Sequence, residues 1–397
     1  MIRFSAAVST ARDSAEAARE AAARARISMG SAMPRLAIVF ASPAYEGLDR
    51  VPHLIETELG SVPLVGGTSG GAVFDGSCVA PRGVLVALIG GDGVRATTVT
   101  APIGSPELID VVPAGSRLLA EADRASHDGL EEALCMAFAP AVHVDGEALV
   151  AAVRKGAGPR MQLAGALVGD DFTFDRALIF AEGGARHDRV VLAGVFTRTR
   201  AGVAARHGWR AVGPVHVVTR SEGAWLLEVD GRRALDVWLA DVRAADGNPP
   251  SDRQELLLYL ANHYEMGVEA PTLIEPLVRA PMALRDDGAV RLSAGVAEGS
   301  RVRVMRASAR DMLEASRQAA EMSRERAGGS ISGAFVFSCS GRRAALADRF
   351  GEEPAGIARA LDAPVAGACV FGEIARAHRE IDAFHNTTAV VVTYPDE

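Results

Sequence analysis

The fold is decided by residues 334–342, which read Ala-Phe-Val-Phe-Ser-Cys-Ser-Gly-Arg. The four apolar residues predict a buried strand, and the Ser-Cys-Ser-Gly that follows cannot continue a core strand. Residues 363–374, Ala-Pro-Val-Ala-Gly-Ala-Cys-Val-Phe-Gly-Glu-Ile, come after a helix-like segment and repeat this pattern. In layered α/β proteins the ends of such strands converge where ligands bind. The polar residues at these two strand ends are therefore the first candidates for a functional site.

The same pattern recurs near the N-terminus. Residues 37–43 predict a strand that ends in Ser-Pro, and residues 62–71 an apolar run that ends in Gly-Gly-Thr-Ser-Gly-Gly. An Ala-Arg-Asp landmark opens an alanine-rich helix at residues 11–13 and again at 309–311, roughly 300 residues later, and the strands keep nearly the same spacing. A weaker third copy runs through residues 134–171. Such self-similarity indicates related supersecondary units.

These repeats predict an α/β protein of two related halves, with mixed sheets covered by helices; αββα layers are one arrangement that would satisfy this pattern. We place the domain boundary between residues 225 and 226, which gives an N-terminal half of residues 1–225 and a C-terminal half of residues 226–397. Within the first half, the apolar residues 84–89 are expected to pair with residues 94–100 across Gly-Gly-Asp-Gly as a hairpin.

Composition excludes several classes of protein. The net charge is −8 with both signs spread along the chain, whereas nucleic-acid binders carry a basic footprint. The first 30 residues contain no apolar core of a signal peptide, and no apolar run is long enough to span a membrane. The four cysteines lack the paired spacing of zinc or redox motifs; they are Cys78, Cys135, Cys339 and Cys369. We therefore expect a cytoplasmic protein without a membrane span or bound nucleic acid.

Several side chains near the two strand ends suit a small polar ligand. Arg342 can hold a carboxylate in a bidentate fork, Glu373 can take an ammonium group, and Phe371 can cover an apolar stem. Gly372 lets the backbone approach a ligand closely. The predicted ligand-binding set is Cys339, Ser340, Arg342, Cys369, Phe371, Gly372, Glu373, His385 and Asn386.

These residues also have other interpretations. Cys339 could be a small buried hydrophobe, Arg342 and Glu373 could form a structural salt bridge, and His385 could make a local turn hydrogen bond. An enzyme is another alternative, with Cys339 and His385 as nucleophile and base and Glu373 orienting the base. Nothing in the spacing requires that pair, and no oxyanion-hole signature is present. We assign no catalytic residue and no metal ligand.

The motifs resemble those of the FIST family of sensory domains. The resemblance is carried by Phe-Ser-Cys-Ser-Gly-Arg at residues 337–342, by Gly-Ala-Cys-Val-Phe-Gly-Glu-Ile at 367–374 and by His-Asn-Thr at 385–387. Further upstream, residues 207–209 and 230–235 resemble the family's central region, and residues 63–71 its N-terminal glycine turn. That turn departs from the family, which usually has a cysteine at Gly67 or Thr68. The likeness spans nearly the whole chain, as a FIST N-terminal half followed by a FIST C-terminal half.

This resemblance implies a bacterial signal-input module that binds a small ligand such as an amino acid. Because the two halves occupy all 397 residues, the signal is expected to leave through a separate signalling protein such as a histidine kinase. No cofactor is expected. The resemblance leaves open a haem-based nitric oxide sensor, in which His207 would be the iron ligand. A protein-interaction scaffold is a further alternative.

Overall fold

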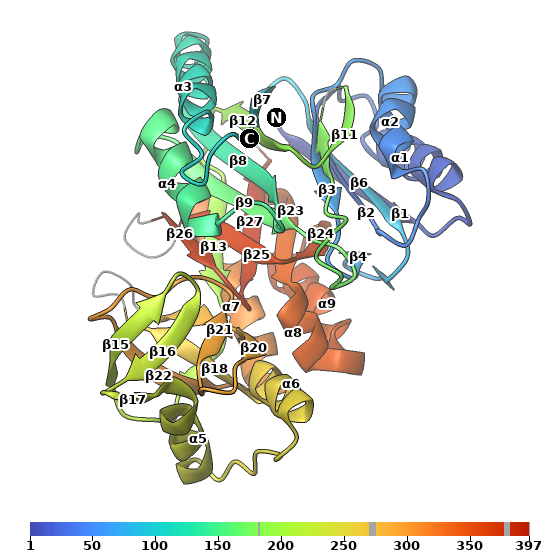
Figure 1. Ribbon diagram of the computed structural model, residues 1–397. Helices are drawn as coiled ribbons and strands as arrows, with labels where there is room; N and C mark the ends of the chain where they lie inside the picture. The colour runs from blue at the N-terminus through green and yellow to red at the C-terminus, as the bar shows by residue number, and fades with distance from the viewer. Residues whose placement is uncertain (182, 270–274, 377–381, 397) are drawn as a thin grey trace.

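The computed structural model of the protein describes residues 1–181, 183–269, 275–376 and 382–396. Their strands form three six-stranded sheets, which we call sheets I, II and III, and a nine-stranded sheet IV. In Figure 1 sheets I to III make up the upper part of the molecule, and sheet IV lies below them. The predicted α/β class, with mixed sheets covered by helices, is confirmed.

The strands of sheets I to III follow one plan. In spatial order, sheet I contains β1 (Arg3–Ser9), β6 (Val84–Gly90), β2 (Pro34–Ala41), β3 (Leu64–Thr68), β10 (Ile179–Ala181) and β11 (Gly184–Arg186). Sheet II contains β7 (Val94–Pro102), β12 (Arg189–Thr197), β8 (Glu132–Pro140), β9 (Gln162–Val168), β25 (Gly372–Arg376) and β26 (Asp382–His385). Sheet III contains β13 (Gly202–Arg206), β27 (Ala389–Pro395), β23 (Ile331–Cys339), β24 (Val365–Val370), β4 (Val73–Asp75) and β5 (Val79–Ala80).

In each of these sheets the third and fourth strands are parallel, and the other pairs between neighbours are antiparallel. The last two strands form a hairpin that comes from a different part of the chain. Counting the three units in chain order, sheet I receives β10 and β11 from the middle unit, sheet II receives β25 and β26 from the C-terminal unit, and sheet III receives β4 and β5 from the N-terminal unit. This cyclic exchange of hairpins ties the three sheets together.

The internal repeat occurs three times, so the copy at residues 134–171 is as complete as the other two. Equivalent helices are α1 (Ser14–Ser28), α3 (Val111–His127) and α7 (Ala309–Ala327), each of which leads into the second strand of its unit. The landmark aspartates of the sequence motif begin two of them. The Asp13 carboxylate caps α1, and Asp311 forms a capping box with Ser308 at the start of α7.

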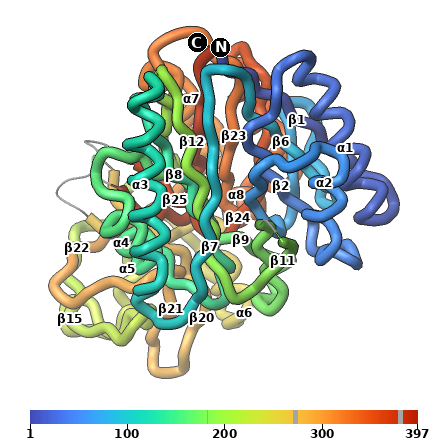
Figure 2. The backbone as a smooth tube through the Cα atoms, turned by 90° about the horizontal axis from the view of Figure 1, so that it is seen from above, coloured from blue at the N-terminus to red at the C-terminus, as the bar shows by residue number. Residues whose placement is uncertain are grey.

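The helices lie outside the three sheets, as the view from above in Figure 2 shows for α1 and α3. Helices α1 and α2 (Val51–Leu59) pack on sheet I, and α3 and α4 (Gly146–Ala157) on sheet II. Sheet III is covered by α7 and α9 (Glu352–Leu361), and α8 (Ser340–Leu346) follows β23 directly. A short 3₁₀ turn at Leu48–Arg50 precedes α2, and another at Ala347–Arg349 follows α8.

The inner faces of sheets I to III share one apolar core. Three phenylalanines at equivalent positions meet there, each in the second strand of its unit. The ring centroids of Phe40 and Phe138 are 6.1 Å apart, those of Phe138 and Phe337 5.7 Å, and those of Phe40 and Phe337 6.5 Å. These rings mark an approximate threefold axis. The residues that follow the three phenylalanines in β2, β8 and β23 lie at one end of this axis.

Sheet IV is an insertion between β13 and α7. It contains β19 (Leu277–Arg279), β18 (Tyr264–Val268), β22 (Arg301–Arg306), β15 (His216–Glu222), β16 (Trp225–Val229), β21 (Val290–Leu292) and β20 (Pro281–Leu284), with β14 (Arg210–Ala211) and β17 (Arg232–Arg233) at its side. Helices α5 (Ala234–Ala244) and α6 (Arg253–His263) pack with it around a core of its own. The predicted boundary between residues 225 and 226 falls within β16, and the division into two halves stays a prediction.

The hairpin predicted from residues 84–89 and 94–100 is wrong. Strand β6 pairs with β1 and β2 in sheet I, whereas β7 pairs with β12 in sheet II. The Gly-Gly-Asp-Gly segment therefore carries the chain from sheet I to sheet II instead of closing a hairpin. In the part of the chain that the structure describes, no helix has the length and apolar character needed to cross a membrane.

Candidate functional site

Three of the predicted site residues lie together at one end of the central core. In β23 the side chains of Phe335 and Phe337 face the core, so the alternation of a strand directs Cys339 to the same side. In β25 Glu373 shares the inner side with Ala375. His385 of β26 is the register partner of Glu373 and lies on the same face of sheet II.

The Glu373 carboxyl group is fully buried. Its Oε2 accepts a hydrogen bond from the backbone N–H of Thr388 at 3.2 Å, and the Cys339 thiol lies beside it. Burial raises the pKa of Glu373 well above its usual value. Burial also raises the pKa of the Cys339 thiol, and the neighbouring Glu373 raises that pKa further. Burial thus favours the neutral form of both groups.

Sheet IV supplies two charged residues that sequence reasoning missed. Glu265 of β18 is fully buried, and its Oε2 accepts a hydrogen bond from Thr387 Oγ1 at 2.8 Å. Burial raises the pKa of Glu265 to about 8. The sequence marked Glu265 only as an acidic residue inside an otherwise apolar strand segment. Such a pattern is not specific enough to identify a site residue.

Arg279 of β19 is the second. Its Nη1 donates hydrogen bonds of 3.2 Å to the Phe384 carbonyl and to Asn386 Oδ1, and its Nη2 donates to Glu147 Oε1 of α4 at 2.5 Å. The predicted site residue Asn386 is therefore a partner of Arg279. Burial lowers the pKa of this guanidinium, and the Glu147 carboxylate opposes that shift.

His207 follows β13 and is also buried, with 4% of its surface exposed. Its Nδ1 accepts a hydrogen bond from the Trp209 N–H at 2.8 Å, and its Nε2 lies 3.6 Å from Glu275 Oε2. Burial, with a smaller contribution from the Arg342 cation, lowers the pKa of His207 to about 3. These surroundings do not fit a haem ligand, because a carboxylate faces the ring nitrogen that would bind iron and cations lie nearby.

We call these residues together the buried polar cluster: His207, Glu265, Arg279, Cys339, Glu373 and His385. Most of its members have one buried polar atom without a hydrogen-bond partner among the described residues. These atoms are His207 Nε2, Glu265 Oε1, Arg279 Nε, Glu373 Oε1 and His385 Nε2. Buried polar groups in folded proteins are nearly always paired, so such a concentration is unusual. Among the residues that the structure describes, no three His, Cys, Asp or Glu side chains form a group that could hold a metal ion.

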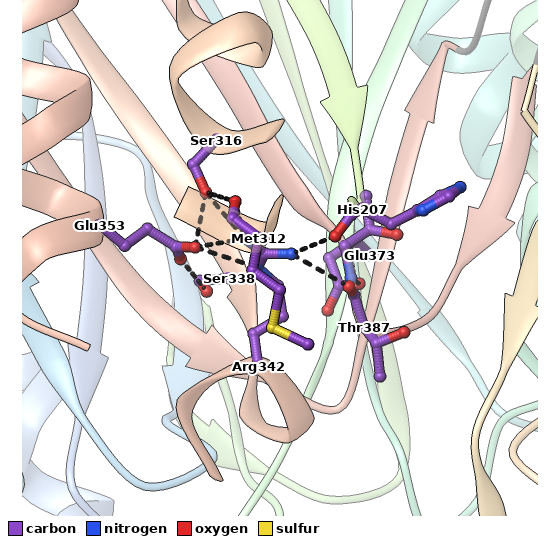
Figure 3. A network of polar contacts seen from close by, with 9 residues as sticks. His207, Met312, Ser316, Ser338, Arg342, Glu353, Glu373 and Thr387 are labelled. Carbon is purple, nitrogen blue, oxygen red and sulfur yellow. Dashed lines mark hydrogen bonds and ion pairs between the residues drawn. The ribbon is translucent and has the colours of Figure 1, made fainter. Parts of the chain in front are cut away.

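Arg342 is not available to a ligand, contrary to the role predicted for it. The guanidinium is fully buried and donates from Nε and Nη2 to Glu353 Oε2, at 3.0 and 2.5 Å. Its other hydrogen bonds go to the His207, Thr387 and Met312 carbonyls and to Ser316 Oγ. Figure 3 shows these contacts surrounding the guanidinium. The alternative of a salt bridge between Arg342 and Glu373 is also wrong, since the partner of Arg342 is Glu353.

The remaining predicted residues lie around the cluster rather than in it. Ser340 Oγ donates to the Gly70 and Val370 carbonyls, and Cys369 packs on the helix-covered side of sheet III. The ring of Phe371 packs with Phe172 and Phe174 at centroid distances of 5.1 and 4.9 Å.

Gly372 is required by packing. A Cβ at this position would lie 2.3 Å from the Phe384 ring. The glycine therefore allows β25 to approach Phe384 closely.

Comparison with known proteins is consistent with the motifs. A family model described as the FIST N domain matches residues 35–232, and one described as the FIST C domain matches residues 234–376. A search of curated proteins finds no match. Among solved structures, one described as "Crystal structure of cyanuic acid hydrolase from A. caulinodans" is similar at 11% identity and a TM-score of 0.34, with 100% of each chain covered. That likeness is too low to bear on function.

FIST domains are sensory domains of signal transduction. The predicted resemblance is confirmed by matches that together span residues 35–232 and 234–376, and the chain belongs to the FIST family.

Proposed function

We propose that this chain is a signal-input module that binds a small polar ligand, such as an amino acid, at the buried polar cluster and passes the signal to a separate protein. The observation that carries the proposal is the set of unpaired buried atoms on Glu265, Arg279, Glu373 and His385. Leaving a polar group buried without a partner costs about 1–3 kcal/mol, and a ligand that pairs several of them recovers that cost.

The location of the cluster supports this role. Glu265 and Arg279 come from sheet IV, whereas Cys339, Glu373 and His385 come from sheets II and III. Binding sites occur preferentially where separate structural units meet. A ligand held by both sides would favour one arrangement of sheet IV relative to the other sheets, which is a change that a partner protein can read.

A thermal-shift screen of amino acids and related metabolites tests ligand binding. A compound that binds only the folded state raises the melting temperature by mass action. The Glu373→Gln variant should lose that shift, and Glu325→Gln is the matched control because Glu325 lies exposed on α7. A hit that shifts wild type and Glu373→Gln equally would place the ligand elsewhere. A screen without any hit would count against a ligand-binding role.

The partner is proposed to be a separately encoded signalling protein such as a histidine kinase, in the cytoplasm. The cytoplasmic assignment is supported by four free cysteines, since oxidising compartments favour disulfides. Crosslinking in the producing cells, followed by purification of the chain, tests the partner. Recovery of the chain alone would contradict it.

The enzyme alternative is less well supported. A cysteine nucleophile acts as a thiolate, and the environment of Cys339 raises the pKa of its thiol.

A further inference from the structure

Two buried carboxyl groups from different sheets are held by consecutive residues of one segment. Thr387 Oγ1 donates to Glu265 Oε2 at 2.8 Å, and the Thr388 N–H donates to Glu373 Oε2 at 3.2 Å. Consecutive Cα atoms are about 3.8 Å apart, so the donors that hold the two carboxyl groups are neighbours on one segment of the chain. Both acids also raise the pKa of the Cys339 thiol, and Glu373 contributes more than Glu265.

Neither acid has a cationic partner among the described residues. The other deeply buried carboxylate nearby, Glu353, is paired with Arg342, and the buried Arg279 is paired with Glu147. Glu265 instead accepts a hydrogen bond from Thr387, and Glu373 accepts one from the Thr388 N–H with the Cys339 thiol as a second neutral partner, and each acid has an Oε1 atom without a partner. Ionising a buried carboxyl group without a cation nearby is costly, so this pair is a place where an added positive charge would be stabilised by the ionised acids.

The fold itself does not call for an acid at position 373. The register of the exchanged hairpins makes Glu373, opposite Ala166, equivalent to Ile179, opposite Gly67. The third equivalent is Val73, opposite Ala368. Two of the three equivalent positions are thus apolar, and the acid is peculiar to the hairpin that borders sheet IV.

His385 adds a third acceptor. Its ring interacts with the Ala375 carbonyl, which favours a proton on the nitrogen facing that carbonyl and leaves Nε2 as an acceptor. Burial lowers the pKa of His385 to about 3, and the Arg279 cation contributes to that shift. The imidazole is therefore neutral and supplies no positive charge to the two acids.

We propose that Glu265 and Glu373 together receive a primary ammonium group of the ligand, which bridges their free Oε1 atoms. An ammonium has three N–H donors, and the cluster offers three unpaired acceptors in Glu265 Oε1, Glu373 Oε1 and His385 Nε2. This inference rests on the proposed ligand-binding function and names the chemical group that the site reads.

Binding should release protons. Burial favours the protonated form of both acids in the free protein, whereas an ammonium between them would favour their ionised forms. The other groups facing the pair from the surrounding elements are the Cys339 thiol of β23, His385 of β26, Arg342 of α8 and Glu353 of α9. Arg342 is a cation that the Glu353 carboxylate pairs, and His385 and Cys339 are neutral, so the two acids carry the pH dependence.

The experiment uses matched pairs of probes in which a hydroxyl replaces the ammonium group. Suitable pairs are L-leucine and 2-hydroxy-4-methylpentanoate, 1-aminobutane and 1-butanol, and 1,5-diaminopentane and 1,5-pentanediol. Isothermal titration calorimetry from pH 6.5 to 8.5, in buffers of different ionisation enthalpy, gives affinity and proton release. We expect that only the amines bind and that their affinity rises by about tenfold per pH unit for each proton released.

Variants separate this inference from the broader proposal. Glu265→Gln and Glu373→Gln should each weaken amine binding by roughly ten- to a hundredfold, because a hydrogen bond to a charged group is lost. Glu325→Gln should bind as wild type. Binding of the hydroxyl probes as tightly as the amines, or amine binding that both Gln variants retain, would overturn the ammonium assignment. If no amine binds at any pH while an anionic or neutral metabolite does, the ammonium assignment is wrong and the ligand-binding role stands.

Discussion

Arg342 and Glu353 form an ion pair that is removed from solvent, with the guanidinium Nε 3.0 Å from the carboxylate Oε2. Ser316 and Ser338 each donate to the same carboxylate, so that the pair joins α7, α8, α9 and β23. The guanidinium also reaches the His207 carbonyl at the edge of the buried polar cluster. The pair therefore holds the elements that surround the site and does not itself contact a ligand.

Breaking this pair should destabilise the protein. We expect Arg342→Met to lower the free energy of unfolding by about 3–5 kcal/mol, because Glu353 is left buried without its cation. Denaturant unfolding measures this. The control is Arg349→Met, which removes the exposed pair with Glu352 and should cost at most about 1 kcal/mol. Equal losses for the two variants would contradict the structural role of Arg342.

The buried Glu265 should make stability depend on pH. Its pKa is about 8 in the folded protein, above the usual value of 4.5, so the stability it contributes is complete below pH 4.5. That contribution is lost as the pH rises toward 8, by up to about 1.4 kcal/mol per pH unit. Glu265→Gln keeps an acceptor for Thr387 and has no proton to lose. The stability of the variant relative to wild type should increase from pH 5 to pH 8 and then level off. A constant difference across that range would show that Glu265 titrates normally.

Thiol reactivity should separate one cysteine from the other three. Cys78 is exposed, whereas Cys135, Cys339 and Cys369 are buried. We expect a thiol reagent to label one site per chain under native conditions and four sites after denaturation. Cys78→Ser should abolish native labelling. Labelling of Cys339 in that variant at a rate comparable with Cys78 would contradict the closed environment described for the cluster.

The end of the threefold axis depends on glycine at position 169. A Cβ there would lie 2.7 Å from Cδ1 of Phe371, whose ring also covers Gly70. We expect Gly169→Ala to cost about 1–3 kcal/mol through overpacking. In the background of Phe371→Ala the same substitution should cost much less, giving a coupling energy of about 0.5–3 kcal/mol in a double-mutant cycle. Additive effects would mean that the ring moves aside without strain.

The sequence predicted the local elements of the repeat well. Apolar runs that end in polar or glycine turns identified β2, β3, β23 and β24. A buried strand is a short apolar run and the turn after it is polar or rich in glycine, so both can be recognised from neighbouring residues alone. The sequence did not reveal which strands pair. Residues 84–89 and 94–100 had the features of a hairpin, yet they lie in separate sheets, since pairing depends on contacts far apart in the chain.

The site shows the same division. Strand ends and motifs identified Cys339, Glu373 and His385, and the structure places them on the inner sides of sheets II and III. Glu265 and Arg279 were missed because they reach the site from sheet IV, and no local pattern marks such a contact. Arg342 was given the wrong role because its partners Glu353, Ser316 and the His207 carbonyl come from different elements.

The sequence by itself determined the α/β class, the internal repeat and the positions of the acid, the thiol and the imidazole, because periodicity and strand ends are local properties of a chain. Only the tertiary structure decided that the repeat is threefold, with each unit giving a hairpin to another. It alone decided which charges are neutralised. Arg342 is paired with Glu353, whereas Glu265 and Glu373 accept hydrogen bonds from the consecutive residues Thr387 and Thr388 and have no ion-pair partner among the described residues. Whether a buried charge is compensated depends on the distance to its neighbours in space, and that distance is fixed only when the sheets pack together.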